Sequence, residues 1–260
     1  MNVSIVIPAY NEERRIGKTL KAYSEYFENL KKKKTLEYNI IVSINGTTDS
    51  TEKIVKSFCK KNKNISYINL KQGGKGYAII EGFKSALRKE SNLIGFVDAD
   101  MATEPSSFYE LIKEIKDNDG IIASRYLKKS IVKPKPALRR IIVSRVFNFL
   151  IKILLFINYS DTQCGAKLFK REALEKVLPR LTLSQLALDV DLLYQFKKAK
   201  LKVKEAPTIW SDKEYSKIKL LSAGPQMFLG IIRLRIINSP FKSLIKIYDL
   251  FLNNKKIKSG

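Results

Sequence analysis

The alternation of short apolar runs with amphipathic stretches over roughly the first 125 residues most constrains the fold of this 260-residue chain. Apolar, β-branched runs separated by helical patterns are typical of βαβ units, whose strands lie parallel in one sheet. We therefore predict an α/β fold with a mostly parallel sheet flanked by helices. The predicted strands are Val3–Ile7, Tyr38–Ile44, Ile65–Leu70, Leu93–Val97 and Gly120–Ala123, and the predicted helices lie near 12–30, 50–61, 75–89 and 105–117.

Polar, turn-forming segments follow four of the predicted strands. Ligands of parallel α/β sheets bind beyond the carboxyl ends of the strands, where such segments meet. We therefore expect one cleft at this edge of the sheet. Its segments are Pro8-Ala9-Tyr10-Asn11-Glu12, Asn45-Gly46-Thr47-Thr48-Asp49, Gly73-Gly74-Lys75-Gly76 and Asp98-Ala99-Asp100.

The carboxylates Asp98 and Asp100 directly follow the apolar run Leu93–Val97. An Asp-x-Asp pair at a strand end supplies oxygen ligands for Mg²⁺ or Mn²⁺, ions that usually share their coordination with substrate phosphates. Two other pairs have the same spacing, Asp117/Asp119 in a turn and Asp189/Asp191 in a helical pattern. The strand-end position favours the first pair as a metal site that binds a nucleotide diphosphate, and a solvated strand end is the alternative.

The composition narrows the chemistry that this chain can perform. It contains no histidine, which excludes imidazole bases, His-ligated zinc and hydrolases that need a histidine partner. The two cysteines stand far apart without metal-ligand spacing and indicate reduced thiols. A formal net charge of +24 indicates an anionic partner, which is a nucleic acid, an anionic lipid surface or a phosphorylated substrate.

The segments after the first three strands offer groups that suit a nucleotide. Gly74 and Lys75 supply backbone N–H groups at a helix start and one ammonium group, which fit an anionic phosphate. Asp49 would accept hydrogen bonds from a base edge, and Glu12 from a ribose hydroxyl. A plain glycine turn and helix capping by each carboxylate are the alternatives.

A basic group opens a predicted helix that runs from Arg139 to Ile157. Arg125, Arg140 and Ser144 would hold a phosphate, because guanidinium groups bind phosphate through two hydrogen bonds and residues four apart share a helix face. A solvated basic face is the alternative. The same helix carries an apolar stripe that would pack in the core or lie at a membrane surface. The stripe consists of Ile142, Val146, Phe149, Ile153 and Phe156.

Two further carboxylates need an explanation because their surroundings are apolar or lead back to the sheet. Asp161 begins a polar stretch that returns to a short strand, and Asp189 lies beside Asp191 in an apolar helical pattern. Asp161 or Asp189 would orient the substrate, contact the water of a metal ion or act as a base. A capping or ion-paired role is the alternative.

Seven sequence pieces in this order resemble one enzyme family. They are Ile7-Pro8-Ala9-Tyr10-Asn11-Glu12, Asn45-Gly46-Thr47-Thr48-Asp49, Gly74-Lys75-Gly76, Asp98-Ala99-Asp100, Ser124-Arg125, Asp161-Thr162-Gln163-Cys164-Gly165 with Lys167-Leu168-Phe169, and Ser216-Lys217-Ile218. Over residues 3 to about 220 the chain resembles family 2 glycosyltransferases of the GT-A fold. Within them it is most similar to the polyprenyl-phosphate sugar synthases, and to the dolichyl-phosphate β-glucosyltransferase branch.

The resemblance implies inverting transfer of a sugar, with glucose favoured, from a nucleotide diphosphate sugar such as UDP-glucose to polyprenyl or dolichyl phosphate. It implies Mg²⁺ or Mn²⁺ at Asp98 and Asp100. The implied donor-binding residues are Pro8, Ala9, Tyr10, Glu12, Asn45, Asp49, Gly74, Lys75, Asp98, Ala99 and Lys217. The implied acceptor-phosphate residues are Arg125, Arg140 and Ser144, and the implied catalytic carboxylates are Asp98, Asp100, Asp161 and Asp189.

The sequence departs from the family pattern at several positions. Asn45 stands where the family commonly has Asp, Lys71 replaces a frequent asparagine, and Ala102 stands where mannose synthases carry a metal-binding glutamine. Donor GDP-mannose or a non-lipid acceptor are alternatives within the fold. An inactive scaffold and a basic nucleic-acid-binding protein are alternatives outside it, but we expect no nucleic acid, because acidic strand ends would repel its phosphates.

We expect a GT-A domain over residues 1–220, with an amphipathic insertion near 133–158, and a C-terminal amphipathic helical segment over 221–260. The N-terminus lacks the basic region and long apolar core of a signal peptide. The longest apolar runs are shorter than the roughly 20 residues that cross a bilayer. We therefore expect peripheral attachment to an anionic membrane surface on the cytoplasmic side, with no transmembrane segment.

Overall fold

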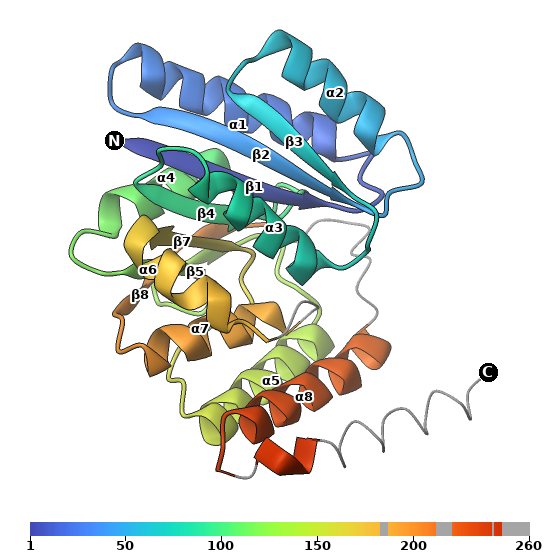
Figure 1. Ribbon diagram of the computed structural model, residues 1–260, viewed down its shortest axis with the longest axis vertical. Coiled ribbons are helices and arrows are strands. Elements are labelled where there is room, and N and C mark those ends of the chain that lie inside the picture. The colour runs from blue at the N-terminus through green and yellow to red at the C-terminus, as the bar shows by residue number, and fades with distance from the viewer. Residues whose placement is uncertain (183–186, 212–219, 241, 246–260) are drawn as a thin grey trace.

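A seven-stranded sheet forms the centre of the computed structural model, which describes residues 1–182, 187–211, 220–240 and 242–245 (Figure 1). The strand order is β3-β2-β1-β4-β7-β5-β8. All strands run in parallel except β7, which is antiparallel to both of its neighbours. The strands are β1 (Asn2–Ala9), β2 (Glu37–Asn45), β3 (Ile65–Leu70), β4 (Leu93–Val97), β5 (Gly120–Ser124), β7 (Ala166–Lys170) and β8 (Val203–Pro207).

The structure confirms all five predicted strands and the predicted mostly parallel sheet. The short strand expected after Asp161 is β7, whereas β8 was not predicted. Nor was a small second sheet, in which β6 (Ile131–Val132) pairs in parallel with β9 (Ile209–Trp210). These strands of two residues are too short to show a hydrophobic period in the sequence.

Four helices follow the first four strands and confirm the predicted helical stretches. They are α1 (Ile16–Lys32), α2 (Thr51–Lys61), α3 (Lys75–Leu87) and α4 (Pro105–Glu114). The first helix begins later than predicted because Asn11 adopts a left-handed conformation, with φ 51°. Its side-chain oxygen accepts a hydrogen bond from the backbone N–H of Thr48 at 2.8 Å, which joins the loops after β1 and β2.

Helices cover both faces of the sheet. On one face α1 and α4 enclose a core that includes Tyr23, Phe27 and Phe108. On the other face α3, α6 (Arg171–Val177) and α7 (Leu188–Lys198) bury Phe83, Phe196 and their neighbours. A short 3₁₀ helix, η1 (Leu178–Arg180), continues α6.

A third layer consists of α5 (Leu138–Leu155) and α8 (Leu220–Ile237), which lie side by side below α7 in Figure 1. Ile151 and Leu155 of α5 pack with Ile231 and Leu234 of α8 and with residues of α7. The 3₁₀ helix η2 (Lys242–Leu244) follows α8. No helix in the described part of the chain is long and apolar enough to cross a membrane.

The predicted helix at 139–157 is confirmed as α5, but its apolar stripe does not pack in the core. The four stripe residues within α5, which are Ile142, Val146, Phe149 and Ile153, are 52–59% exposed. The opposite face of α5 packs against the protein instead. Core packing of the stripe, one of the two alternatives from the sequence, is therefore wrong, and an exposed apolar ridge remains.

The contact between β4 and β7 predicts a strict requirement for a small residue at Gly95. A Cβ atom there would collide with the backbone oxygen of Lys167 and lie 2.9 Å from the ring of Phe108. We expect Gly95→Ala to lower the free energy of unfolding by about 1–3 kcal/mol, the usual cost of overpacking, in urea titrations. Gly17→Ala is the control, since its Cβ would lie 3.6 Å from Ile54; an equal loss in both variants would contradict the prediction.

Candidate active site

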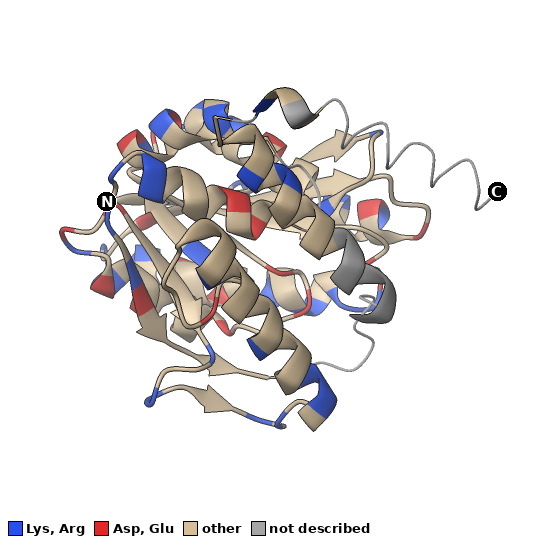
Figure 2. Ribbon diagram, turned by 90° about the horizontal axis from the view of Figure 1, so that it is seen from below, with Lys and Arg blue, Asp and Glu red and all other residues tan. Residues whose placement is uncertain are grey.

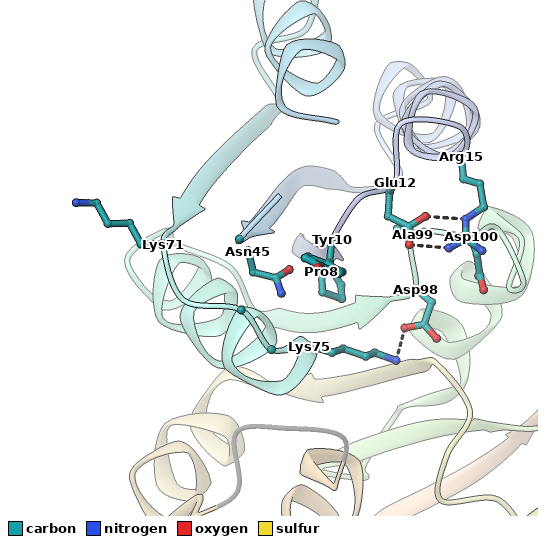
Figure 3. A pocket seen from close by; sticks show the side chains of 13 residues that line it. Pro8, Tyr10, Glu12, Arg15, Asn45, Lys71, Lys75, Asp98, Ala99 and Asp100 are labelled. Carbon is teal, nitrogen blue, oxygen red and sulfur yellow. Dashed lines mark hydrogen bonds and ion pairs between the residues drawn. The ribbon is translucent and has the colours of Figure 1, made fainter. Parts of the chain in front are cut away.

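A cavity of about 610 Å³ lies at the carboxyl ends of β1, β2 and β4, where the sequence predicted a cleft (Figure 3). This volume is in the range of small-molecule and cofactor sites. Eight of the predicted donor-binding residues line it, namely Pro8, Tyr10, Glu12, Asn45, Gly74, Lys75, Asp98 and Ala99. Asp100, Arg15, Gly46, Lys71 and Gly73 complete the lining.

An ion pair between Lys75 and Asp98 crosses the floor of the cavity. The ammonium Nζ of Lys75, at the start of α3, lies 2.5 Å from Oδ1 of Asp98 at the end of β4 (Figure 3). Burial and the neighbouring Asp100 raise the pKa of Asp98 above its ordinary value, and Lys75 opposes this. The pKa of Lys75 is also raised, because Asp98 and Asp189 outweigh its burial.

The segment just before β7 also contacts Asp98. The backbone N–H of Asp98 donates to the backbone oxygen of Gly165 at 3.0 Å, just before β7 begins. A Cβ atom on Gly165 would collide with the carboxylate of Asp98. Gly165 is therefore a glycine because the carboxylate fills the space that a side chain would need.

Asp98 and Asp100 offer hard oxygen donors, and the residues present fit a Mg²⁺ or Mn²⁺ ion that shares its ligands with a diphosphate. The chain turns sharply after Asp100, since Met101 has φ 60° and Ala102 donates its N–H to Oδ1 of Asp100 at 2.9 Å. No cluster of three metal-ligating side chains occurs among the described residues. Two carboxylates would thus need further ligands from substrate and water.

Several predicted donor residues bond to protein groups. Glu12 binds Arg15 through two hydrogen bonds of 2.6 Å. The side-chain amide of Asn45 bridges two loops, with its nitrogen 2.8 Å from the oxygen of Ala9 and its oxygen 3.0 Å from the nitrogen of Gly74. An amide can donate and accept in this position, which a carboxylate cannot.

Asp49 and Ala9 do not line the cavity, although the sequence placed both among the donor residues. The carboxylate of Asp49 accepts hydrogen bonds from the backbone N–H groups of Glu13 and Thr51, at 3.1 and 2.9 Å. It thus fastens the first turn of α2 to the loop after β1, which is the capping alternative. Lys217 lies outside the described residues.

The predicted acceptor residue Arg125 is bound to the predicted catalytic residue Asp161. The guanidinium Nε and Nη2 of Arg125 donate to the two carboxylate oxygens of Asp161, at 2.7 and 2.9 Å. Both side chains are largely buried. Burial acts to raise the pKa of Asp161, but the hydrogen bonds and charge of Arg125 together hold it below its ordinary value.

Aromatic rings surround the predicted acceptor-phosphate residues. The guanidinium carbons of Arg125 and Arg140 lie 5.2 and 5.9 Å from the ring centre of Trp210. That of Arg145 lies 4.4 Å from the ring of Tyr126, whose hydroxyl donates to Ser144 at 2.9 Å. We call these five residues, Arg125, Tyr126, Arg140, Arg145 and Trp210, the arginine–aromatic cluster. Ser144 contacts the cluster through its hydrogen bond with Tyr126.

The two carboxylates in α7 are both bound to partners inside the protein. Asp189 forms an ion pair of 2.5 Å with Lys167, whose side chain is fully buried and also donates to the oxygen of Cys164 at 2.7 Å. Asp191 accepts hydrogen bonds from the backbone of Thr182 and from Gln195. The negative charge of Asp189 also contributes to the raised pKa of Lys75.

Sequence reasoning missed Arg15 and Trp210 as contributors to the site, and it noted Lys167 only as part of a motif that returns toward the cleft. The spacing of Arg15 three residues after Glu12, on the same side of a helical turn, is a signal that could have identified it. Trp210 gave no such signal, and the pairing of Lys167 with Asp189 could not be read from the sequence, because the partners are distant along the chain. Lys71 was noted as a departure from the family, and Figure 3 shows its side chain pointing away from the other labelled residues.

The family model named "Glycosyl transferase family 2" matches residues 4–178 of this chain. The dolichyl-phosphate beta-glucosyltransferase of Dictyostelium discoideum is 33% identical over 260 residues, which cover 95% of this chain and 76% of that protein. The human protein of the same name is 33% identical over 246 residues, covering 90% of this chain and 75% of that one.

Solved structures with the same fold bind a nucleotide and a divalent ion. Glucosyl-3-phosphoglycerate synthase from Mycobacterium tuberculosis, in complex with Mn²⁺, uridine diphosphate and phosphoglyceric acid, superimposes with a TM-score of 0.68 at 15% identity. The match covers 92% of this chain and 80% of that one. A complex of that enzyme with Mg²⁺ and uridine diphosphate superimposes with a TM-score of 0.65 at 16% identity. This match covers 90% of this chain and 78% of that one.

The lowered pKa of Asp161 predicts a pH-dependent contribution to stability. As the pH falls, the Asp161 carboxyl group of the unfolded chain, with a pKa of about 3.9, binds its proton at a higher pH than the same group in the folded protein does. The contribution is therefore complete above about pH 4 and is lost as the pH falls through the lower folded pKa. We expect Asp161→Asn to cost about 3–5 kcal/mol at pH 7, because Arg125 would lose its partner, and the difference from wild type to shrink below about pH 4.

Urea unfolding of the variant and of wild type at pH 7 and pH 3 measures this difference in the free energy of unfolding. The other carboxyl groups are common to both proteins, so their contributions cancel. Asp117→Asn, at an exposed turn, is the control and should stay within about 0.5 kcal/mol of wild type at both values. A pH-independent difference between Asp161→Asn and wild type would show that the ion pair does not depress the pKa of this carboxyl group.

Proposed function

Since this chain belongs to glycosyl transferase family 2 and is thus a glycosyltransferase, we propose that it transfers glucose from UDP-glucose to a polyprenyl phosphate such as dolichyl phosphate. One observation carries this proposal. The segment that follows the cavity residues Asp98 and Asp100 is linked to the arginine–aromatic cluster, because Thr103 forms an isolated β-bridge with Trp210. The proposed site for a nucleotide diphosphate and the proposed site for a second phosphate would thus be connected through this segment.

The relatives support the choice of sugar and acceptor. The proteins named dolichyl-phosphate beta-glucosyltransferase are 33% identical over nearly the whole of this chain. The structural neighbours bind uridine diphosphate on the same fold, which supports a uridine nucleotide in the cavity.

The cavity supplies the donor-binding groups. Pro8, Tyr10 and Asn45 lie at the ends of β1 and β2, where the base and ribose would bind. Lys75 and the backbone N–H groups at the start of α3 would hold the diphosphate, since a helix N-terminus attracts anions. A Mg²⁺ or Mn²⁺ ion held by Asp98 and Asp100 would neutralise charge on the leaving diphosphate.

The arginine–aromatic cluster supplies the acceptor-binding groups. We assign the acceptor phosphate to Arg140 and Ser144, at the first turns of α5, with Arg125 fixed beside them by Asp161. An arginine held by a buried carboxylate keeps a defined position, and its positive potential is partly neutralised. Asp161 therefore positions Arg125, and this role replaces the direct contact with substrate that the sequence suggested.

In the proposed reaction an oxygen of the acceptor phosphate attacks the anomeric carbon of the sugar. The bond from that carbon to the diphosphate oxygen breaks, the nucleotide diphosphate leaves, and the configuration inverts. A phosphate monoester has its second pKa near about 6, so the nucleophile is already anionic at neutral pH. A strong base is not required, which agrees with a chain that contains no histidine.

The exposed ridge of α5 supports peripheral attachment to a membrane on the cytoplasmic side, where a nucleotide sugar is available. The stripe ends at Phe156, just after α5, and this residue is also exposed, as are Ile131 and Ile209, which pair in the small sheet. Arg235 and Lys197 lie 5.5 and 5.7 Å from the ring of Phe156. Figure 2, which views this layer from below, shows mostly uncharged helices with Lys and Arg toward their ends. Apolar side chains with a basic rim suit an anionic lipid surface.

The proposed function predicts formation of a lipid-linked sugar. Radiolabelled UDP-glucose, GDP-mannose and UDP-N-acetylglucosamine are each incubated with the enzyme and Mg²⁺ or Mn²⁺, with and without polyprenyl phosphate, and the label is extracted into organic solvent. We expect lipid-soluble label from UDP-glucose only when polyprenyl phosphate is present. Label from another donor would correct the sugar, and label without the lipid would indicate a different acceptor.

Asp100→Ala should reduce this activity by about 100-fold or more, because even partners of metal ligands contribute about 10–100-fold. Asp117→Ala, in the similarly spaced pair at an exposed turn, is the control and should retain full activity. Full activity of Asp100→Ala would refute the assignment of Asp100 as a metal ligand.

The membrane proposal predicts that charges on the ridge weaken binding to lipid. We expect the double variant Phe149→Asp/Ile153→Asp to bind phosphatidylserine-containing vesicles at least about tenfold more weakly in sedimentation assays, because each apolar side chain contributes about 1.5–3 kcal/mol when buried. Ser57→Asp/Lys60→Gln changes the net charge equally on the exposed face of α2 and is the control. Equal loss in both variants would indicate a general electrostatic effect and no specific use of the ridge.

A further inference from the structure

The indole ring of Trp210 contacts two of the arginines near the acceptor site. The guanidinium carbons of Arg125 and Arg140 lie within 6 Å of the ring centre, which is the range of cation–π attraction. Arg125 precedes α5 in the chain and Arg140 lies in its first turn, whereas Trp210 comes from β9. The ring of Trp210 therefore contacts both the segment after β5 and the start of α5, which are separate from β9 along the chain.

Trp210 itself is fixed by the backbone around it. Its side chain is only 6% exposed, and Val132 of β6 is its strand partner. An antiparallel bridge links it to Thr103, and the N–H of Ser211 donates to the oxygen of Ala102 at 3.0 Å. Ala102 and Thr103 directly follow the turn after Asp100. The ring is thus connected to the segment that carries the proposed metal ligands.

Arg125 has a second, buried anchor besides the indole ring. The Nε and Nη2 groups of Arg125 both donate to Asp161 in a buried ion pair. Arg125 therefore has a defined position without the indole ring. Arg140 is half-buried at the start of an exposed helix, and ordering an arginine side chain costs about 2 kcal/mol of rotamer entropy. A planar ring beneath its guanidinium group reduces that cost in advance.

We propose that Trp210 is a positioning residue for the acceptor: its ring holds Arg140 in place for the acceptor phosphate and ties this arginine to the segment after Asp100. The inference rests on the proposed function for the identity of the acceptor. It assigns a role to a residue outside the donor cavity, and it separates acceptor binding from donor binding. Removing the ring then weakens binding of the acceptor without weakening binding of the nucleotide sugar.

Steady-state kinetics with UDP-glucose and a short-chain polyprenyl phosphate test this separation. For Trp210→Leu we expect the KM for the acceptor to rise roughly three- to thirty-fold, the range that corresponds to one cation–π contact, with the KM for UDP-glucose within about twofold of wild type. Trp210→Phe keeps an aromatic face and should restore most of the acceptor affinity. Tyr67→Leu removes the ring below Lys56 at the far edge of the sheet and should change neither constant.

An equal rise of both KM values, or no rise for the acceptor, would overturn the inference. So would a failure of Trp210→Phe to recover acceptor affinity while its thermal unfolding midpoint matches that of wild type. If Trp210→Leu does not fold, the comparison of Trp210→Phe with wild type and a spectroscopic titration still decide the question.

Trp210 is the single tryptophan of the chain, so its fluorescence reports on this position alone. Titration of the wild-type protein with the short-chain polyprenyl phosphate, without donor, should give a saturable change in emission. Arg140→Gln should weaken the acceptor binding measured by this titration. The loss should be at least as large as the factor by which Trp210→Leu raises the KM for the acceptor. An unchanged emission spectrum at saturating acceptor would count against the inference.

The two readouts distinguish this inference from the proposed function. Absence of lipid-linked product from every donor, together with a saturable fluorescence change that Arg140→Gln removes, would refute the proposed reaction and retain a phosphate site beside Trp210. Lipid-linked product from wild type with unaltered acceptor KM in Trp210→Leu would retain the reaction and refute the positioning role.

Discussion

The reversed direction of β7 between two parallel strands is the constraint on which the rest of the site depends. Because β7 enters the sheet from the edge at which β4 ends, the segment before it crosses the carboxyl ends of the strands. Gly165 there supports Asp98, Asp161 there binds Arg125, and Lys167 reaches Asp189 in α7. One antiparallel strand therefore fixes the carboxylate of the donor cavity, an arginine of the acceptor site and the helix behind them.

Local pattern was sufficient to predict the parallel part of the sheet and the position of the cavity. Five strands have short, mostly apolar runs, and the helices between them have a clear period, so the order of elements follows from residues that are near each other in the chain. The rule that ligands bind at the carboxyl ends of parallel strands then placed Asp98, Asp100 and Lys75 together. The two-residue strands β6 and β9 have no such period, and they carry Trp210.

The pairing of charged groups could not be predicted in the same way, because it depends on three-dimensional neighbours. Arg125 and Asp161 are 36 residues apart, and Lys167 and Asp189 are 22 apart. The sequence suggested separate roles for Arg125, Asp161 and Asp189, with no ion pairs among them, whereas burial forces such groups to find opposite charges. Asp49 and Asn45 show the same effect at smaller scale, since each uses its polar atoms to join loops.

Helix α5 carries Arg140 in its first turn and the exposed apolar ridge along its length. On the proposed function, the residue that meets the acceptor and the residues that meet the lipid are therefore parts of one rigid rod. Such an enzyme searches for its acceptor in two dimensions, and its rate follows the mole fraction of acceptor within the bilayer. Diluting the acceptor with inert lipid would then slow the reaction even when its total amount in the sample is constant.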